Sequence, residues 1–420
     1  MKRYGIPILL SAALAVGAFT GCANVSSASA SDMISSASST APSSMAAEPA
    51  GSMGSMGAMG GMEMTRASYA SEPASGSIID TSSLFTDRDL EQTADTVNAT
   101  EVTVKSGEDI TISEEGVYVI SGTATDCTIT VDADSAAKVQ LVLDGVSITN
   151  ADAPAIYVLS ADKVFVTTAS GSSNELTTTG EFAAIGDVTN IDGVIFAKDD
   201  LVLNGQGTLT INSSASGVVG KDDVKITGGT YSITATEHGI QGKDSVAIAE
   251  GTFNITAGTD AIHAKNDEDL TLGYAYIAGG TFNLNGASDG IEGYAVVQID
   301  GGDITIDSQE GIEGTYIQIN GGIIDIQASD DGMNAAQKSS AYWPTLEIND
   351  GEITVVMGSG DTDGIDSNGD LYINGGHIDV TGGSTFDYDG TGEFNGGTLI
   401  VNGQELDSLP NQMMGGRGRW

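Results

Sequence analysis

The feature of this 420-residue chain that most constrains its fold is a short internal repeat. A three-residue marker, acidic–Gly–Ile in its clearest copies, recurs through the second half of the sequence. Its first residues are Ser216, His238, Asp260, Asp289, Glu310, Asp331 and Asp363. The successive intervals are 22, 22, 29, 21, 21 and 32 residues, which indicates a period near 22 with two insertions. A repeat this short cannot bury a hydrophobic face alone, so its copies must stack into one continuous core.

Short strand-like segments fill the sequence between these markers. In Asp303–Asp307, for example, apolar and small polar residues alternate, which is the period of a half-buried strand. Gly-Gly pairs, such as those that begin at Gly228 and Gly279, supply the turns. No stretch has a convincing helical period, and a β-propeller would need about twice this repeat. We therefore predict an all-β, three-stranded solenoid of roughly 14 coils over residues 101–403.

The N-terminus has the pattern of an export signal. Lys2 and Arg3 precede an uncharged apolar run, Ile6–Phe19, which is too short to span a bilayer comfortably. Thr20-Gly21-Cys22 follows and has the form of a lipobox, although ordinary signal cleavage beside an incidental cysteine is the alternative. Lipidation of Cys22 would make the protein an extracellular, membrane-anchored lipoprotein. The predicted divisions are a signal peptide (1–21), a flexible Ser/Ala/Gly/Met-rich tether (22–85), a solenoid domain (86–403) and a tail (404–420).

Charge narrows the classes of partner. The chain has 58 acidic and 15 basic residues, with a net charge of -43. Nucleic acid is therefore excluded as an expected partner, because phosphate binding requires a basic surface. An acidic exported chain is expected to bind cations or simply to have a well-solvated surface. With Cys22 used for lipidation, Cys127 has no intramolecular disulfide partner, and we expect a monomer.

Basic residues are few, yet four of them follow the repeat. They are Lys198, Lys221, Lys243 and Lys265, at intervals of 23, 22 and 22 residues. An acidic or amide residue follows each one, so a parallel row of carboxylates that neutralises the lysines is one interpretation. The other is a row of cations that binds the carboxylates of a uronic-acid polymer.

Acidic residues flank the Gly-Ile pair in the later copies. These pairs are Asp289 with Glu292, Glu310 with Glu313, and Asp363 with Asp366, while Asp331 is followed by Asn334. Because the intervening Ile or Met points inward, both flanking side chains should face outward from one turn. Stacked carboxylates this close should not all ionise without a cation between them, and Ca²⁺ accepts six to eight oxygen ligands with loose geometry. We therefore predict Ca²⁺ sites here, with Asp260, Asp267 and Asp330 as further ligands; hydrated, partly protonated acids are the alternative.

The two insertions interrupt the regular surface. One covers roughly residues 266–276 and contains Tyr274, and the other covers roughly residues 337–345 and contains Tyr342 and Trp343. Exposed aromatic rings are natural platforms for sugars. The alternative is that these rings pack down and close the loops.

Several segments resemble a known family. They are Glu114–Thr123, Val139–Asn150, Ala155–Val158, Asp162–Val166 and Ser288–Gly293. Together they are similar to the clostridial-type secreted carbohydrate-binding domain family, over about residues 100–403. The resemblance implies a right-handed parallel β-helix like that of pectate-type polysaccharide lyases. It also implies Ca²⁺ and binding of polygalacturonate, pectin-like or cellulosic glycans, but it does not by itself imply catalysis.

A lyase is the alternative function. β-Elimination on a uronate needs a cation on the carboxylate and a base for the C5 proton, for which Lys265 and then Lys243 are the candidates. Neighbouring carboxylates should raise the pKa of a lysine, which argues against that role unless bound Ca²⁺ reverses the local field. His238 and His263 lie in the repeated turns, as ligand contacts or as surface residues. A glycan-binding lipoprotein, a Ca²⁺-dependent lyase and a structural adhesin therefore remain open.

Overall fold

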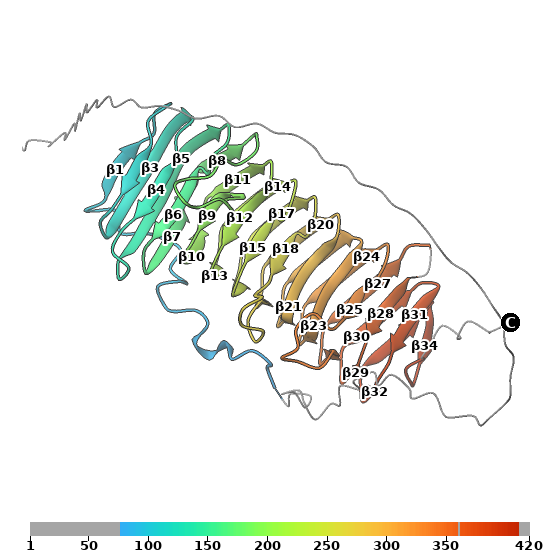
Figure 1. Cartoon of the computed structure of the whole chain (residues 1–420). Coiled ribbons are helices and arrows are strands. Elements are labelled where there is room, and N and C mark those ends of the chain that lie inside the picture. The colour runs from blue at the N-terminus through green and yellow to red at the C-terminus, as the bar shows by residue number, and fades with distance from the viewer. Residues whose placement is uncertain (1–75, 360–361, 411–420) are drawn as a thin grey trace, which may run out of the picture. The chain divides into compact units, whose positions relative to one another are not determined.

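The computed structural model describes residues 76–359 and 362–410. Within these ranges the chain winds through successive coils whose strands stack in parallel on the equivalent strands of the next coil (Figure 1). The predicted all-β solenoid is therefore confirmed as a parallel β-helix. The predicted signal peptide, Cys22, residues 22–75 of the predicted tether and residues 411–420 lie outside the described residues. No helix in the described part of the chain is long and apolar enough to cross a membrane.

Three ladders of parallel strands make up the described solenoid. Ladder 1 comprises β1 (Thr100–Thr103), β3 (Gly116–Thr125), β5 (Lys138–Asn150), β7 (Lys163–Thr168), β10 (Asp200–Gly205), β13 (Asp223–Ile226), β16 (Ser245–Ile248), β19 (Tyr274–Ile277), β21 (Asp289–Ile299), β23 (Glu310–Ile319), β26 (Thr345–Ile348), β29 (Asp370–Ile373) and β32 (Gly392–Phe394).

Ladder 2 begins with the second halves of β3 and β5. It continues with β8 (Ser173–Thr178), β11 (Thr208–Ser213), β14 (Thr230–Ala235), β17 (Thr252–Ala257), β20 (Thr281–Gly286), β22 (Asp303–Ser308), β24 (Ile323–Ala328), β27 (Glu352–Met357), β30 (His377–Thr381) and β33 (Thr398–Val401). The last strand, β34 (Gln404–Leu406), pairs antiparallel with β33 and lies within the predicted tail.

Ladder 3 carries the candidate site. It comprises β2 (Ile110–Ile112), β4 (Ile129–Asp132), β6 (Ile156–Ser160), β9 (Gly193–Ala197), β12 (Ser216–Gly220), β15 (Ile240–Gly242), β18 (Ile262–Ala264), the first halves of β21 and β23, β25 (Met333–Ala335), β28 (Asp363–Ser367) and β31 (Ser384–Tyr388).

The length of each coil explains both the number of coils and the irregular intervals between the repeated markers. Ladder 1 has 13 strands in the described residues, close to the roughly 14 coils predicted from an even period. After ladder 3 a coil normally turns within two residues, as at 243–244, but residues 265–273 and 336–344 form longer loops there. The remaining extra residues of the 32-residue interval lie between β27 and β28.

The core follows directly from the alternating pattern. In β22, for example, Ile304 and Ile306 are buried, whereas Asp303, Thr305 and Asp307 face solvent. Equivalent side chains stack from coil to coil, as for the rings of Phe253 and Phe282, whose centroids are 4.7 Å apart. The glycine of the marker is required by the close approach of successive coils. A Cβ on Gly311 would lie 2.3 Å from the carbonyl oxygen of Gly332.

The segment before the first ladder strand covers the outer face of ladder 1 and contains a 3-10 turn, η2 (Thr81–Ser83). The Ile78 and Ile79 amides donate to Gln318 and Gln298, both at 2.9 Å, and Leu84 is buried. Residues 76–85 fall within the predicted tether, yet they contact the solenoid, so the ordered domain begins before Thr86. The outer face of ladder 2 remains exposed, and ladder 3 carries most of the clustered charge.

Candidate functional site

The outer face of ladder 3 changes from apolar to charged along the solenoid. In the early coils Phe196 and Val219 face outward, and Ile185 and Ile191 from the loop after β8 cover them. Gln241 follows Val219 in the same register, and the residues after it form the strand column, which is His263, Glu292, Glu313, Asn334 and Asp366. The first residues of the markers from His238 onward form the turn column, which is His238, Asp260, Asp289, Glu310, Asp331 and Asp363. Together the two columns make up the acidic face.

Carboxylates in the middle of the acidic face are close together and shielded from water. Asp289, Glu292 and Glu313 are only 5%, 4% and 6% exposed. One oxygen from each of Asp289, Glu310 and Glu313 lies within 4.8 Å of the others, and the same holds for Asp260, Asp289 and Glu292. The structure thus brings together the paired positions that the repeat predicted, across several coils.

Burial and mutual repulsion disfavour ionisation of these groups. Burial, followed by the charges of Asp260 and Glu292, raises the pKa of Asp289 to about 8. Burial also raises the pKa of Glu313 to about 7, although Lys338 opposes the shift. At the far end of the acidic face, burial and neighbouring carboxylates raise the pKa of Asp331 to about 6 and that of Asp366 to about 7. A divalent cation would relieve this repulsion.

Lys338 reaches over the acidic face from the loop 336–344. Its Nζ lies 2.9 Å from Glu292 Oε1 and also pairs with Glu313. Burial opposes the charge of Lys338, but hydrogen bonds to Glu313 and Glu292 outweigh it and raise its pKa. The Ser339 hydroxyl beside it donates to the Leu270 carbonyl at 2.5 Å, which joins the two long loops. Sequence reasoning missed Lys338, although it is the only lysine after Lys265 and stands in an insertion.

Two histidines lie at the other end of the buried carboxylates. The rings of His238 and His263 are stacked with centroids 4.2 Å apart, and both Nδ1 atoms face Asp260 Oδ2. Burial disfavours the charged imidazole of His263, but hydrogen bonds to Asp260 and Glu292 outweigh it and raise its pKa to about 9. Burial also opposes ionisation of Asp260, yet the two histidines lower its pKa overall.

The four predicted lysines stack on successive coils just beyond the strand column. The amides of Lys221, Lys243 and Lys265 donate to the preceding coil at 2.8, 3.0 and 3.1 Å, and Lys198 occupies the same position in an earlier coil. Tyr294 takes the next position, with its ring centroid 4.5 Å from Lys265 Nζ. The register of the repeat could have identified this tyrosine. The lysine column therefore borders the acidic face.

The neighbours of both candidate bases favour the protonated form of the lysine. A hydrogen bond to Glu268, at 2.5 Å, raises the pKa of Lys243. A hydrogen bond to Tyr294 is the largest of several causes that raise the pKa of Lys265, and Asp267 pairs with this lysine at 3.4 Å. A hollow of about 220 Å³ is lined by Lys221, Lys243, Lys265, Asp267 and Glu268. These contacts favour the charged form of Lys243 and Lys265, and a role of either lysine as a base stays a prediction.

The remaining predicted site residues are distributed more widely. Asp267 lies in the exposed loop 265–273, apart from the buried carboxylates. Tyr274 and Tyr342 are half-buried and pack with Ile78 and Ile79 against ladder 1, which agrees with the structural alternative for these rings. Trp343 is half-buried beside Gly369 of the next coil. Their role in sugar stacking stays a prediction.

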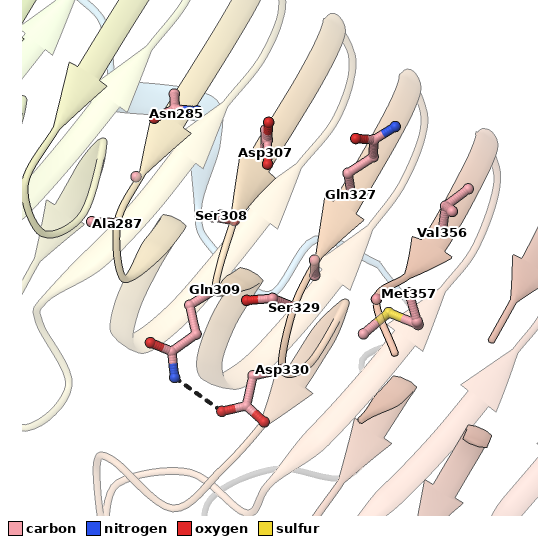
Figure 2. Close-up of a pocket in the computed structure, with 13 residues that line it drawn as sticks. Asn285, Ala287, Asp307, Ser308, Gln309, Gln327, Ser329, Asp330, Val356 and Met357 are labelled. Atoms are coloured by element: carbon pink, nitrogen blue, oxygen red, sulfur yellow. Dashed lines mark hydrogen bonds between the residues drawn. The ribbon is translucent and has the colours of Figure 1, made fainter. Parts of the chain in front are cut away.

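Asp330 lines an open groove of about 800 Å³ beside the turn column, between ladders 2 and 3. Figure 2 shows Asn285, Asp307, Gln327 and Val356 projecting from consecutive strands along one side of this groove. On the other side, the Gln309 amide donates to Asp330 Oδ2 at 3.0 Å (Figure 2). Hydroxyl, amide and carboxylate groups therefore repeat along the groove at the spacing of the coils.

A protein-family profile described as "Carbohydrate-binding domain-containing protein" matches residues 106–362 and 308–398. The chain belongs to this carbohydrate-binding domain family. A family member from Acetivibrio thermocellus, of the same description, is 39% identical over 127 residues. That match covers 30% of this chain and 44% of the relative, so the chain spans less than half of that protein. A solved polysaccharide lyase-like protein from C. thermocellum, a gadolinium derivative, is 26% identical, with 72% of this chain and 96% of that chain covered and a TM-score of 0.41.

Proposed function

We propose that this carbohydrate-binding domain protein binds an acidic, polygalacturonate- or pectin-like polysaccharide at the cell surface through Ca²⁺ held on the acidic face. The single observation that carries the proposal is the run of buried carboxylates beside an open polar groove. With a net charge of -43, the protein repels a polyanion unless cations lie between the two. A bound cation thus explains how so acidic a surface serves such a ligand.

The carboxylates present fit a hard divalent cation. Asp289, Glu310 and Glu313 offer oxygens within 4.8 Å of one another, and Ca²⁺ binds carboxylate oxygens in flexible geometry. The raised pKa of Asp289 supports this assignment, because burial and the neighbouring charges of Asp260 and Glu292 disfavour its ionisation, and a bound cation would offset both. Asp331, Asp363 and Asp366 would hold a second ion farther along the face, where the same repulsion recurs. A bound ion supplies a positive centre to which a sugar carboxylate can be added as a further ligand.

The groove and the lysine column give the polymer two further sets of contacts. Amide groups such as those of Gln309 and Gln327, and the hydroxyl of Ser329, suit sugar hydroxyls along the groove (Figure 2). Lys243 and Lys265, on the other side of the acidic face, carry positive charges for uronate groups. Their raised pKa values support binding over β-elimination, which would require an unprotonated base.

Anchoring completes the proposal. Cys22 follows an apolar run in lipobox form, and we place the protein outside the cell as a membrane lipoprotein. Labelling of Cys22 by radioactive palmitate, and its loss in Cys22→Ser, tests this part separately. Unlabelled wild-type protein released into the medium would contradict it.

The binding test uses the full chain and immobilised polygalacturonate, with Ca²⁺ or with a chelator. We expect retention that depends on Ca²⁺, and no new absorbance from an unsaturated uronate. Glu313→Gln should weaken retention, whereas Asp325→Asn, an exposed acidic residue on ladder 2, should not.

Other outcomes would contradict the proposal in distinct ways. Rising absorbance that Lys265→Ala abolishes would establish a lyase. Equal retention on cellulose would show that sugar carboxylates are not what is recognised. Retention on neither polymer would favour a structural adhesin.

A further inference from the structure

The pair of histidines at the end of the acidic face has no role in the proposed Ca²⁺ site. Four side chains converge there from three consecutive coils: His238, Asp260, His263 and Glu292. Asp260 Oδ2 lies 3.1 Å from His238 Nδ1 and 2.8 Å from His263 Nδ1. Glu292 Oε2 lies 2.7 Å from the same Nδ1 of His263. One donor atom from each of His238, Asp260 and His263 lies within 4.8 Å of the others, and Glu292 contacts the His263 donor from the next coil.

Protons alone satisfy this arrangement poorly. The Nδ1 of His263 carries at most one hydrogen, yet two carboxylate oxygens lie within 2.8 Å of it. The Nδ1 of His238 likewise has both Asp260 Oδ2 and the Thr259 hydroxyl, at 3.0 Å, within reach. His263, Asp260 and Glu292 are all buried, so water cannot readily supply the hydrogen-bond donors that the carboxylate oxygens lack.

We propose that His238, His263 and Asp260, with Glu292 as a fourth ligand, form a binding site for a d-block divalent cation such as Zn²⁺. Donors about 2.1 Å from one ion stand about 3.4 Å apart in tetrahedral geometry. The donor pairs Asp260–His238, Asp260–His263 and Glu292–His263 are 2.7 to 3.1 Å apart, so each of these three pairs needs only a small outward shift to reach this spacing. Two neutral imidazoles and two carboxylates also balance the charge of a divalent ion.

Ligand chemistry separates this site from the proposed Ca²⁺ sites. Imidazole nitrogen suits Zn²⁺, Cu²⁺ or Ni²⁺, whereas Ca²⁺ prefers oxygen alone. The neighbouring coils offer only carboxylates, at Asp289, Glu310 and Glu313. Glu292 lies at the boundary, because its Oε1 contacts Lys338 while its Oε2 faces His263. One solenoid face would then hold two kinds of cation on adjacent coils.

Titration of the chelator-treated full chain with Co²⁺ tests the proposal, because Co²⁺ bound to nitrogen and oxygen donors has visible d–d absorption. We expect one equivalent to bind, with affinity at least about tenfold lower in His263→Gln and in His238→Gln. His377→Gln is the matched control, because His377 is exposed on β30, and it should bind as wild type. Excess Ca²⁺ should not displace the Co²⁺. Circular dichroism of each variant verifies that the solenoid is intact.

Three results would overturn the inference. They are absence of d–d absorption in the wild type, unchanged affinity in both of the folded His238 and His263 variants, and displacement of Co²⁺ by equimolar Ca²⁺. Each is independent of carbohydrate, so failure here leaves the polysaccharide-binding proposal untouched.

Discussion

Replacement of Lys338 by methionine should destabilise the metal-free protein strongly and in a pH-dependent way. The lysine Nζ neutralises Glu292 and Glu313, whose side chains are 6% and 7% exposed. Methionine preserves most of the apolar stem but removes the charge. Both carboxylates would then remain buried with one fewer positive partner.

The size of the expected stability loss follows from the burial of the ion pairs that Lys338 makes with Glu292 and Glu313. Removing one member of a buried ion pair costs about 3–5 kcal/mol, because the remaining charge is uncompensated. The Lys338 side chain is 26% exposed, and water therefore compensates in part. We expect a loss of about 3 kcal/mol in the free energy of unfolding at pH 8 without Ca²⁺.

The loss should shrink on acidification. Glu313 has a folded-state pKa raised to about 7, above its ordinary value, so the folded protein takes up a proton that the unfolded chain does not as pH falls through 7. Protonation removes the uncompensated charge and stabilises the folded state. At pH 5 we expect Lys338→Met to lose only about 1 kcal/mol, the scale of a lost neutral hydrogen bond.

Urea unfolding followed by circular dichroism at pH 8 and pH 5 measures both values. The matched control is Lys105→Met, whose pair with Glu108 is 3.3 Å long but exposed. Exposed pairs contribute about 1 kcal/mol or less, so this variant should change little at either pH. A Lys338 variant as stable as wild type at pH 8, or equally destabilised at both pH values, would show that the charge of Lys338 does not stabilise the buried Glu292 and Glu313.

Three further predictions follow from the same geometry. Gly311→Ala should lose about 1–3 kcal/mol, because its Cβ would lie 2.3 Å from the Gly332 carbonyl, whereas Gly383→Ala, with no atom within 4 Å, should unfold like wild type. Ca²⁺ should raise the thermal midpoint more at pH 8 than at pH 5, because protons compete for Asp289, whose pKa is about 8; an equal rise would argue against this carboxylate as a ligand. Lys265→Ala should weaken retention on polygalacturonate without changing uronate absorbance, and retention unaltered by the loss of this charge would remove the lysine column from the binding surface.

Much of the acidic face could be predicted from the repeat. The positions of Asp289, Glu292, Glu310 and Glu313 relative to Gly-Ile were enough to expect outward-facing carboxylates on one face, because a fixed register places equivalent residues in a column. The same logic placed the four lysines. It did not extend to Tyr294, which occupies the lysine position in the next coil but differs in chemistry.

The contacts made by the loops could not be predicted from the repeat. The sequence shows where residues 265–273 and 336–344 are inserted, but not that Lys338 folds back onto Glu292 or that Ser339 meets Leu270. Nor did it reveal that Ile78 and Leu84, within an apparently flexible segment, pack against the solenoid. These contacts depend on surfaces that exist only after the coils have stacked.

The repeat alone is enough to predict the all-β solenoid, its period and the charged columns, since each is a local pattern repeated at a constant interval. The tertiary structure decided how deeply those charges are buried and which atoms face one another. Burial raises the pKa of Asp289. The stacking of coils brings the Nδ1 atoms of both histidines to Asp260. Desolvation and donor geometry arise from packing between coils and loops distant in the sequence, and no short pattern encodes them.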